Sequence, residues 1–267
     1  MRILLVLVLI ASISPALAAP FKTKAPYALL VDQTSGRTLF QKNADSGMAP
    51  ASTTKILTAE IVFGRLAAGQ LKPDDAFTVS PHAATEGNAK SGGSSMFLQA
   101  GQRVSVDELL QGLLTDSGND AAIAIAEGIA GSEAAFAVIM NAHARAIGMA
   151  HSHFTNPWGR AGNRVTPRDM VRLAAHVIAA YPQYYKYFSE PGLTYGSIAQ
   201  KNRNPLIGIG ADGLKTGQLA VSGFGLVASA QRGGHRLILV LNGLKSEAAR
   251  ASEGRRMLEY GFAVIGG

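Results

Sequence analysis

The sequence predicts an α/β fold of the α+β type, with an antiparallel sheet flanked by helices and a helical lobe inserted between the strands. Three observations support this prediction. Strand-like runs bounded by turn residues lie towards both ends of the chain, and the stretch from about residue 60 to 180 is largely helical in pattern. The 267 residues contain no internal repeat or low-complexity linker, and they suffice for one large domain with a buried core.

The chain begins with a pattern typical of secretory signal peptides. Met1-Arg2 precedes a short apolar run, and small residues follow up to Ala16-Leu17-Ala18. The apolar run is too short for a membrane-spanning helix. We therefore expect a signal peptide at 1–18 and one domain at 19–267, exported to the bacterial periplasm or cell envelope.

The next elements are a hairpin and a helix. Residues 27–32 and 37–40 flank the turn at 33–36 and predict a β-hairpin. A helix is expected to begin near Ser52 and to run to about Ala68, where Gly69 ends it.

Helices dominate the middle of the chain and strands its last third. Apolar residues at helical spacing over 106–148 predict several packed helices, one of them starting at Ser132. Thr166-Pro167 predicts another helix start, with an N-cap and a proline in the first helical position. Strands are expected near residues 193–195, 213–216, 223–230 and 236–241, and a last helix at about 246–264.

Composition excludes several function classes. The chain has no cysteine, which rules out disulfides, thiolate catalysis and cysteine–zinc sites. The net charge of +7 is scattered without interleaved aromatic residues, so no nucleic-acid partner is expected. His151-x-His153 lacks a third ligand nearby, and Gly92-Gly93 is not followed by a phosphate-loop pattern, so we expect no metal and no cofactor. Residues 85–95 instead predict a mobile loop.

Three short motifs carry the chemistry, and each occurs once: Ser52-x-x-Lys55, Ser117-Gly118-Asn119 and Lys215-Thr216-Gly217. The first alone is weak, because about one such match is expected by chance and Ser52 could simply cap a helix. Residues three apart share a helix face, so Lys55 can reach the Ser52 hydroxyl. Burial, the helix N-terminus and a second cation such as Lys215 would favour the neutral amine that a general base requires.

In this order the motifs form the signature of penicillin-binding proteins and serine β-lactamases. The chain resembles, over nearly all of residues 19–267, the D-alanyl-D-alanine carboxypeptidase family of low-molecular-weight penicillin-binding proteins. The resemblance also includes the segments Ser94-Ser95-Met96-Phe97-Leu98, His153-Phe154-Thr155-Asn156-Pro157-Trp158-Gly159 and Asn202-Arg203-Asn204-Pro205-Leu206. It implies a β-lactamase/transpeptidase-like fold and removal of the terminal D-Ala from peptidoglycan stem peptides.

The resemblance also implies a role for each motif residue. Ser52 would attack the carbonyl with Lys55 as base, and Ser117 would relay a proton to the leaving D-Ala nitrogen. Asn119 would hold the substrate backbone. Lys215 and Thr216 would bind the terminal carboxylate, and Gly217 would be a further substrate-binding residue. The backbone N–H groups of Ser52 and Gln218 would bind the oxyanion. β-Lactams would acylate Ser52.

Two departures from the family pattern stand out. Members often carry a hydroxyl residue where this chain has Leu219, so one contact to the carboxylate is expected to differ. Better-known members also have a second, β-rich domain and a C-terminal anchor helix. Since this chain stops at Gly267, we expect a single catalytic domain without a membrane anchor.

Three alternatives stay open. A D,D-endopeptidase that cuts D-Ala–diaminopimelate cross-links would use the same chemistry. A class A β-lactamase is a weaker match, because Glu190-Pro191-Gly192-Leu193-Thr194 lacks the asparagine of the corresponding loop. The third alternative is a non-catalytic binder of penicillin or cell wall.

Overall fold

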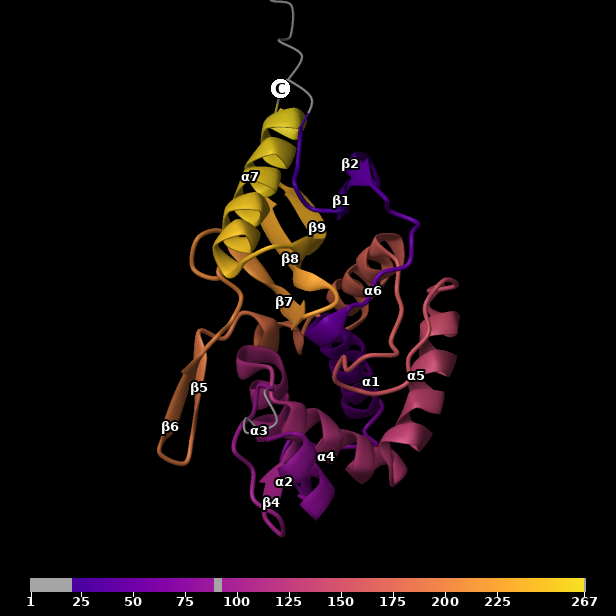
Figure 1. Cartoon of the computed structure of the whole chain (residues 1–267), viewed down its shortest axis with the longest axis vertical. Coiled ribbons are helices and arrows are strands. Elements are labelled where there is room, and N and C mark those ends of the chain that lie inside the picture. The colour runs from indigo at the N-terminus through magenta and orange to yellow at the C-terminus, as the bar shows by residue number, and fades with distance from the viewer. Residues whose placement is uncertain (1–20, 89–92, 267) are drawn as a thin grey trace, which may run out of the picture.

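The structure, a computed structural model, describes residues 21–88 and 93–266. The predicted signal peptide and part of the predicted loop at 85–95 lie outside these residues. A five-stranded antiparallel sheet in the order β2-β1-β9-β8-β7 forms one half of the molecule (Figure 1), which confirms the predicted fold class. Its strands are β1 (Tyr27–Asp32), β2 (Thr38–Lys42), β7 (Ala211–Leu219), β8 (Gly223–Arg232) and β9 (His235–Leu244).

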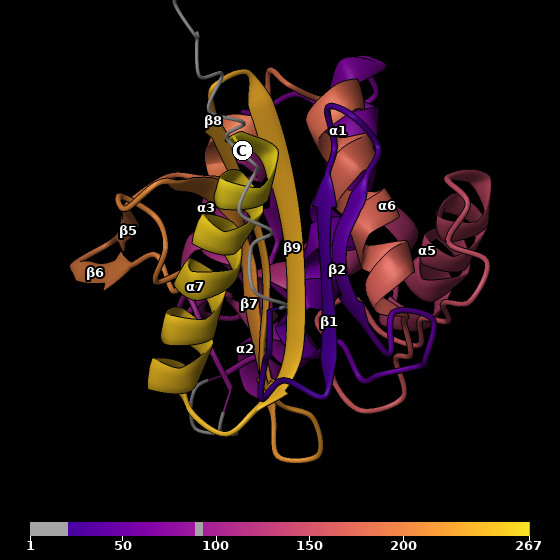
Figure 2. The same ribbon diagram turned by 90° about the horizontal axis from the view of Figure 1, so that it is seen from above.

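Helices cover both faces of this sheet (Figure 2). Because successive side chains of a strand point to opposite faces, each strand contributes to two cores. One face packs on α7 (Glu247–Gly266), through Leu30, Leu226, Leu239, Leu241 and Met257. The other packs on α1 (Lys55–Ala67) and α6 (Pro167–Ala180), through Leu29, Val227, Ile238, Val240 and Ile56.

The rest of the middle segment is mainly helical. It contains α2 (Pro81–Glu86), α3 (Val106–Gln111), α4 (Asn119–Ala130) and α5 (Glu133–Ala146). Two predicted helix starts are confirmed: the Ser132 hydroxyl accepts a hydrogen bond from the Ala135 N–H, and the Thr166 hydroxyl accepts one from the Asp169 N–H. The small sheet of β3 (Ala76–Thr78) and β4 (Arg103–Ser105) was not predicted, because three-residue strands leave almost no periodic pattern.

One predicted strand belongs to a different sheet. The strand predicted near residues 193–195 is confirmed as β5 (Gly192–Tyr195), which pairs with β6 (Ile198–Lys201) as a separate hairpin outside the main sheet. Figure 1 shows this hairpin projecting away from the sheet. The strand near residues 193–195 was predicted, whereas β6, which follows it after a two-residue turn, was not.

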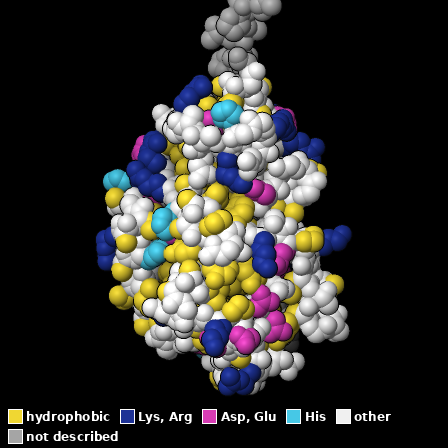
Figure 3. All heavy atoms as spheres, turned by 180° about the vertical axis from the view of Figure 1, so that it is seen from behind, with side chains coloured by type: hydrophobic (Ala, Val, Ile, Leu, Met, Phe, Trp, Pro, Cys, Tyr) yellow, Lys and Arg dark blue, Asp and Glu magenta, His cyan; other side chains and the backbone are white. Residues whose placement is uncertain are grey.

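One face of the molecule carries its charges in a dispersed pattern. On the face opposite to that of Figure 1, lysine and arginine side chains lie apart from one another among neutral and hydrophobic groups (Figure 3). Within residues 21–88 and 93–266, no single helix has both the length and the apolar composition to cross a membrane. Among the helices that the structure describes, only α4 and α5 taken together, bent by 83°, pass that test.

Candidate active site

Three backbone segments meet at the turn before α1. This turn is the 3-10 helix η1 (Ala51–Thr54), and Ser52 lies inside it and does not occupy an N-cap position. A Cβ atom on Gly159 would lie 1.9 Å from the Ala51 carbonyl oxygen, and one on Gly217 would lie 2.7 Å from the Pro50 carbonyl oxygen. Glycine is therefore required at both positions, and Ser52 is held between a loop and strand β7.

Lys55 is fully buried behind Ser52 at the start of α1. Its Nζ lies 3.1 Å from Ser52 Oγ and 3.4 Å from Ser117 Oγ. The Nζ also donates to Asn119 Oδ1 at 2.6 Å and to the Trp158 backbone carbonyl at 3.2 Å. Both carbonyl oxygens can only accept hydrogen bonds, so each of them binds one N–H group of Lys55. In the neutral amine the remaining position is the lone pair, which then points towards the serines.

The surroundings of Lys55 favour its neutral form. Burial lowers the pKa of Lys55 well below its ordinary value, and repulsion from Lys215 lowers it further. Asp116 and Asp120 act in the opposite direction but do not compensate for the burial. A neutral amine has a lone pair with which it can accept the Ser52 proton, so the pair has the geometry and the electrostatics of a nucleophile and its base.

Ser117 reaches this centre through an unusual backbone. It follows the π-helical turn η3 (Gly112–Asp116) and has φ of 75°, which is uncommon for a residue with a side chain. The Gly118 N–H donates to the Gly112 carbonyl at 2.9 Å and closes the turn. Irregular turns of this kind often occur at functional sites, and here the turn directs the Ser117 hydroxyl at Lys55.

Asp120 fixes the wall of the site beside Asn119. Its buried carboxylate accepts hydrogen bonds from the Ser95 hydroxyl at 2.6 Å and from the backbone N–H groups of Met96 and Leu98, each at 3.0 Å. The Asn119 N–H donates to the Ser94 carbonyl at 2.8 Å. The start of α4 and the segment 94–98 therefore form one hydrogen-bonded unit.

These elements surround a cleft of about 620 Å³. Six of the eight residues predicted from the motifs line it: Ser52, Ser117, Asn119, Thr216, Gly217 and Gln218. Leu219, the departure from the family pattern, lines it as well. Lys55 and Lys215 are buried behind the lining. Burial, followed by repulsion from Arg203, lowers the pKa of Lys215 to about 7.

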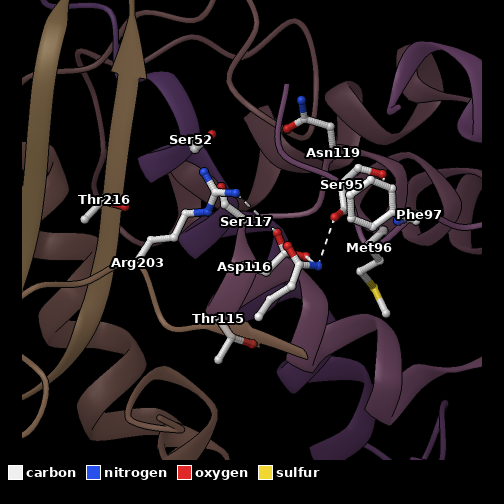
Figure 4. Close-up of polar contacts among 12 residues, drawn as sticks. Ser52, Ser95, Met96, Phe97, Thr115, Asp116, Ser117, Asn119, Arg203 and Thr216 are labelled. Carbon is white, nitrogen blue, oxygen red and sulfur yellow. Dashed lines mark hydrogen bonds and ion pairs between the residues drawn. The ribbon is translucent and has the colours of Figure 1, made fainter. Parts of the chain in front are cut away.

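Charged side chains at the cleft include three arginines, Arg160, Arg203 and Arg250. Arg160 lies 3.9 Å from Glu86, and Arg250 lies 3.6 Å from Glu247. Arg203 faces the buried carboxylate of Asp116 at 3.8 Å (Figure 4). Lys215, with its pKa of about 7, adds positive charge when it is protonated, so the cleft suits a substrate with an anionic end.

Sequence reasoning missed Asp116 and gave Arg203 no role. Burial raises the pKa of Asp116 to about 7, although Arg203 opposes the shift, and Gln200 Nε2 donates to its Oδ2 at 3.0 Å. Arg203 could have been identified from its place in the segment 202–206. The only sequence signal for Asp116 was its position next to Ser117. The Trp158 carbonyl had no signal, because a backbone group leaves none in the sequence.

The other residues considered from the sequence lie elsewhere. Glu190 does not line the cleft in the part of the chain that the structure describes, and its backbone carbonyl accepts from Asn202 Nδ2 at 2.8 Å. The His153 backbone pairs with Arg164, and the His151 N–H donates to Asp169. None of these residues takes part in the Ser52–Lys55 arrangement.

Comparisons with known proteins agree with this geometry. The family model described as D-alanyl-D-alanine carboxypeptidase matches residues 14–246. The carboxypeptidase DacD of Salmonella typhimurium is 37% identical over 270 residues, covering 95% of this chain and 69% of the relative. DacC of Escherichia coli, also a D-alanyl-D-alanine carboxypeptidase, is 40% identical over 240 residues, covering 88% and 60%. Penicillin binding protein 5 from Haemophilus influenzae has a similar structure, with a TM-score of 0.88 and 35% identity, covering 92% of this chain and 73% of that one.

The chain thus spans 60–69% of the length of these two curated relatives. The family model covers well over half of the chain, and the structural likeness confirms the predicted β-lactamase/transpeptidase-like fold. The chain belongs to the D-alanyl-D-alanine carboxypeptidase family of serine peptidases.

Proposed function

We propose that the chain is a serine-type D-Ala–D-Ala carboxypeptidase that removes the terminal D-Ala from peptidoglycan stem peptides. The observation that carries the proposal is the 3.1 Å approach of Lys55 Nζ to Ser52 Oγ, at the edge of a cleft and with a strongly lowered pKa of the amine. Membership of the family supplies the substrate class.

In the first step, Lys55 accepts the hydroxyl proton of Ser52 while Ser52 Oγ attacks the carbonyl carbon of the penultimate D-Ala. The oxyanion binds to the backbone N–H groups of Ser52 and Gln218. Donors of this kind typically contribute a few kcal/mol each to transition-state stabilisation. The close packing of Gly217 against the η1 backbone supports this placement.

In the second step, the tetrahedral intermediate collapses and the C–N bond breaks. The proton held by Lys55 passes to the Ser117 hydroxyl, and Ser117 donates its own proton to the leaving D-Ala nitrogen. The 3.4 Å between Lys55 Nζ and Ser117 Oγ supports this relay. Water then hydrolyses the Ser52 ester and regenerates the enzyme.

The substrate lies along β7 with its carboxylate towards the cations. Asn119 binds the peptide backbone, and Thr216 binds the carboxylate directly. Lys215 lies behind the lining with a pKa near 7, so an arriving carboxylate favours its protonated form. Arg203 adds a second positive charge at the lining, and Leu219 offers no hydroxyl for a further hydrogen bond.

The predicted signal peptide and the family membership also indicate a cellular location and a class of inhibitors. Residues 1–18 would direct export to the cell envelope, where the stem peptides are found, and 19–267 would form the catalytic domain. β-Lactams would acylate Ser52, in keeping with the name of the penicillin binding protein from Haemophilus influenzae. No cofactor enters the steps.

The test is release of D-Ala from a peptide ending in D-Ala–D-Ala. The parent enzyme and the control variant Ser46→Ala, at an exposed serine, should release D-Ala at equal rates, and Ser52→Ala should release none. Digestion of purified peptidoglycan distinguishes carboxypeptidase activity from the endopeptidase alternative. Loss of D-Ala from monomeric muropeptides supports the proposal, whereas falling cross-linked dimers with intact monomers would contradict it.

A further inference from the structure

A second cluster of chemically active side chains lies outside the cleft. Glu60 of α1, His143 of α5 and His176 of α6 meet although they are far apart in the sequence. His143 Nε2 lies 2.9 Å from Glu60 Oε1, and His176 Nδ1 lies 2.5 Å from the same oxygen. The two imidazole rings are 6.2 Å apart at an interplanar angle of 78°, so both present a nitrogen edge to one carboxylate.

The hydrogen bonds within the cluster leave one polar atom unsatisfied. Glu60 is completely buried, and its Oε2 has no hydrogen-bond partner among the described residues. Leaving such an atom unpaired typically costs about 1–3 kcal/mol, more for a charged group. Both imidazoles contact Glu60 Oε1. Pairing of the glutamate with two histidines therefore does not explain why Oε2 is buried without a partner.

The cluster is also accessible from solvent. The side chains of His143 and His176 are 26% and 38% exposed, while Glu60 forms the floor beneath them. Two of the three residues therefore border solvent, at the surface above a buried carboxylate.

The donor set identifies the ion. The three ligand atoms all lie within 4.8 Å of one another, and ligands around a tetrahedral zinc ion are about 3.3 Å apart, so small rotations of the exposed rings suffice. Two imidazole nitrogens and one carboxylate suit Zn²⁺, whereas Mg²⁺ and Ca²⁺ prefer oxygen ligands only. We propose that Glu60, His143 and His176 bind one Zn²⁺ ion, with water as the fourth ligand.

Zinc at this position would act on the fold and not on the reaction. The three ligands join α1 to α5 and α6, and Glu60 lies five residues beyond Lys55, or about 7.5 Å along the helix axis. A bound ion therefore braces the helix whose first turn carries the catalytic lysine. This inference does not depend on the proposed function, because the binding site shares no residue with the cleft.

The experiment is titration of the full chain, freed of metal with a chelator, with ZnCl₂ in a calorimeter and in thermal unfolding. We expect one ion per chain and a midpoint raised by about 5–10 °C when zinc is 100-fold above its dissociation constant. Co²⁺ in place of Zn²⁺ should give the visible absorption of a tetrahedral nitrogen–oxygen site. Far-ultraviolet circular dichroism without zinc reports that each variant is folded.

Variants decide the outcome. His176→Ala removes a partly exposed ligand and should weaken binding at least 100-fold, with loss of the thermal shift and of the cobalt spectrum. The matched control is His82→Ala, which removes the contact between His82 and Glu133. It should leave the zinc affinity, the thermal shift and the cobalt spectrum unchanged. Equal zinc binding by the parent and His176→Ala, or no saturable binding by the parent, would overturn the proposal and leave the cluster as a set of ion pairs.

Discussion

The protonation state of Lys55 is set mainly by its burial. Asn119 Oδ1 and the Trp158 carbonyl each accept one N–H, and the amine is fully buried. The lowered pKa of Lys55 follows mainly from this burial, with Lys215 as the next contribution. A neutral amine facing Ser52 is the physical basis of the proposed mechanism.

Lys55→Arg tests this requirement. A guanidinium does not lose its proton in proteins, so it cannot accept one from Ser52. We expect β-lactam acylation to slow by about 10²–10⁴-fold, the usual contribution of a general base. Lys72→Arg, at an exposed lysine, should acylate like the parent. Near-parental acylation by Lys55→Arg would show that the amine is not the base.

Asn119→Asp tests the electrostatics directly. Asn119 Oδ1 lies 2.6 Å from Lys55 Nζ, and a carboxylate there would stabilise the charged amine. The acid limb of the pH profile for acylation should therefore move up by about 1–3 pH units. If the midpoint of the acid limb of the acylation rate is the same in Asn119→Asp and in the parent, this limb reports the titration of a group other than Lys55.

At the scale of elements, close backbone contacts position Ser52, the proposed nucleophile. Gly159 has φ of +94°, and a Cβ there would collide with the Ala51 carbonyl, just before Ser52. The Trp158 carbonyl that contacts Lys55 belongs to the same loop. Displacement of this loop should therefore disturb the nucleophile and the base together.

Gly159→Ala and Gly69→Ala form a matched pair of variants. Gly69 has φ of +68°, and a Cβ added there would meet nothing within 4 Å, so its replacement by alanine adds only backbone strain, about 1 kcal/mol. Gly159→Ala adds a collision and should cost several kcal/mol more in urea unfolding. Where Gly159→Ala still folds, acylation should fall at least tenfold. Equal stabilities of the two variants would contradict the packing described for η1.

Elements were predictable where a local rule defines them. The caps at Ser132 and Thr166 and the hairpin of β1 and β2 were predicted because capping and turn chemistry act over a few residues. The strand β6 and the π-helical turn before Ser117 were not predicted, because neither a four-residue strand nor an irregular turn leaves a distinctive local pattern. The motif serines and lysines were found from spacing, whereas the Glu60 cluster combines residues from three helices with no shared spacing.

At the scale of the whole molecule, the buried charges should make stability depend on pH. Burial raises the pKa of Asp116 to about 7 in the folded state, against about 3.9 when unfolded. Between these values the folded state binds more protons, so the free energy of unfolding falls as pH rises from about 4 to about 7. Lys215, with its lowered pKa, acts in the opposite direction above about pH 7.

Asp116→Asn isolates the first of these effects. The amide keeps the shape of the side chain but does not titrate, so the variant should gain stability relative to the parent as pH rises, by about 3–4 kcal/mol at pH 7. Urea unfolding of both proteins at pH 4, 5.5 and 7 measures the difference. A difference that does not change with pH would mean that Asp116 is not held protonated in the fold.

The most direct measurement for the whole account is the second-order rate constant for acylation of Ser52 by a β-lactam as a function of pH, followed by intact mass. The lowered pKa of Lys55 predicts that the rate reaches its plateau well below about pH 10, with the adduct on Ser52. A rate that keeps rising to a midpoint near about 10.4, the value of an ordinary lysine, or an adduct on any other residue, would contradict it.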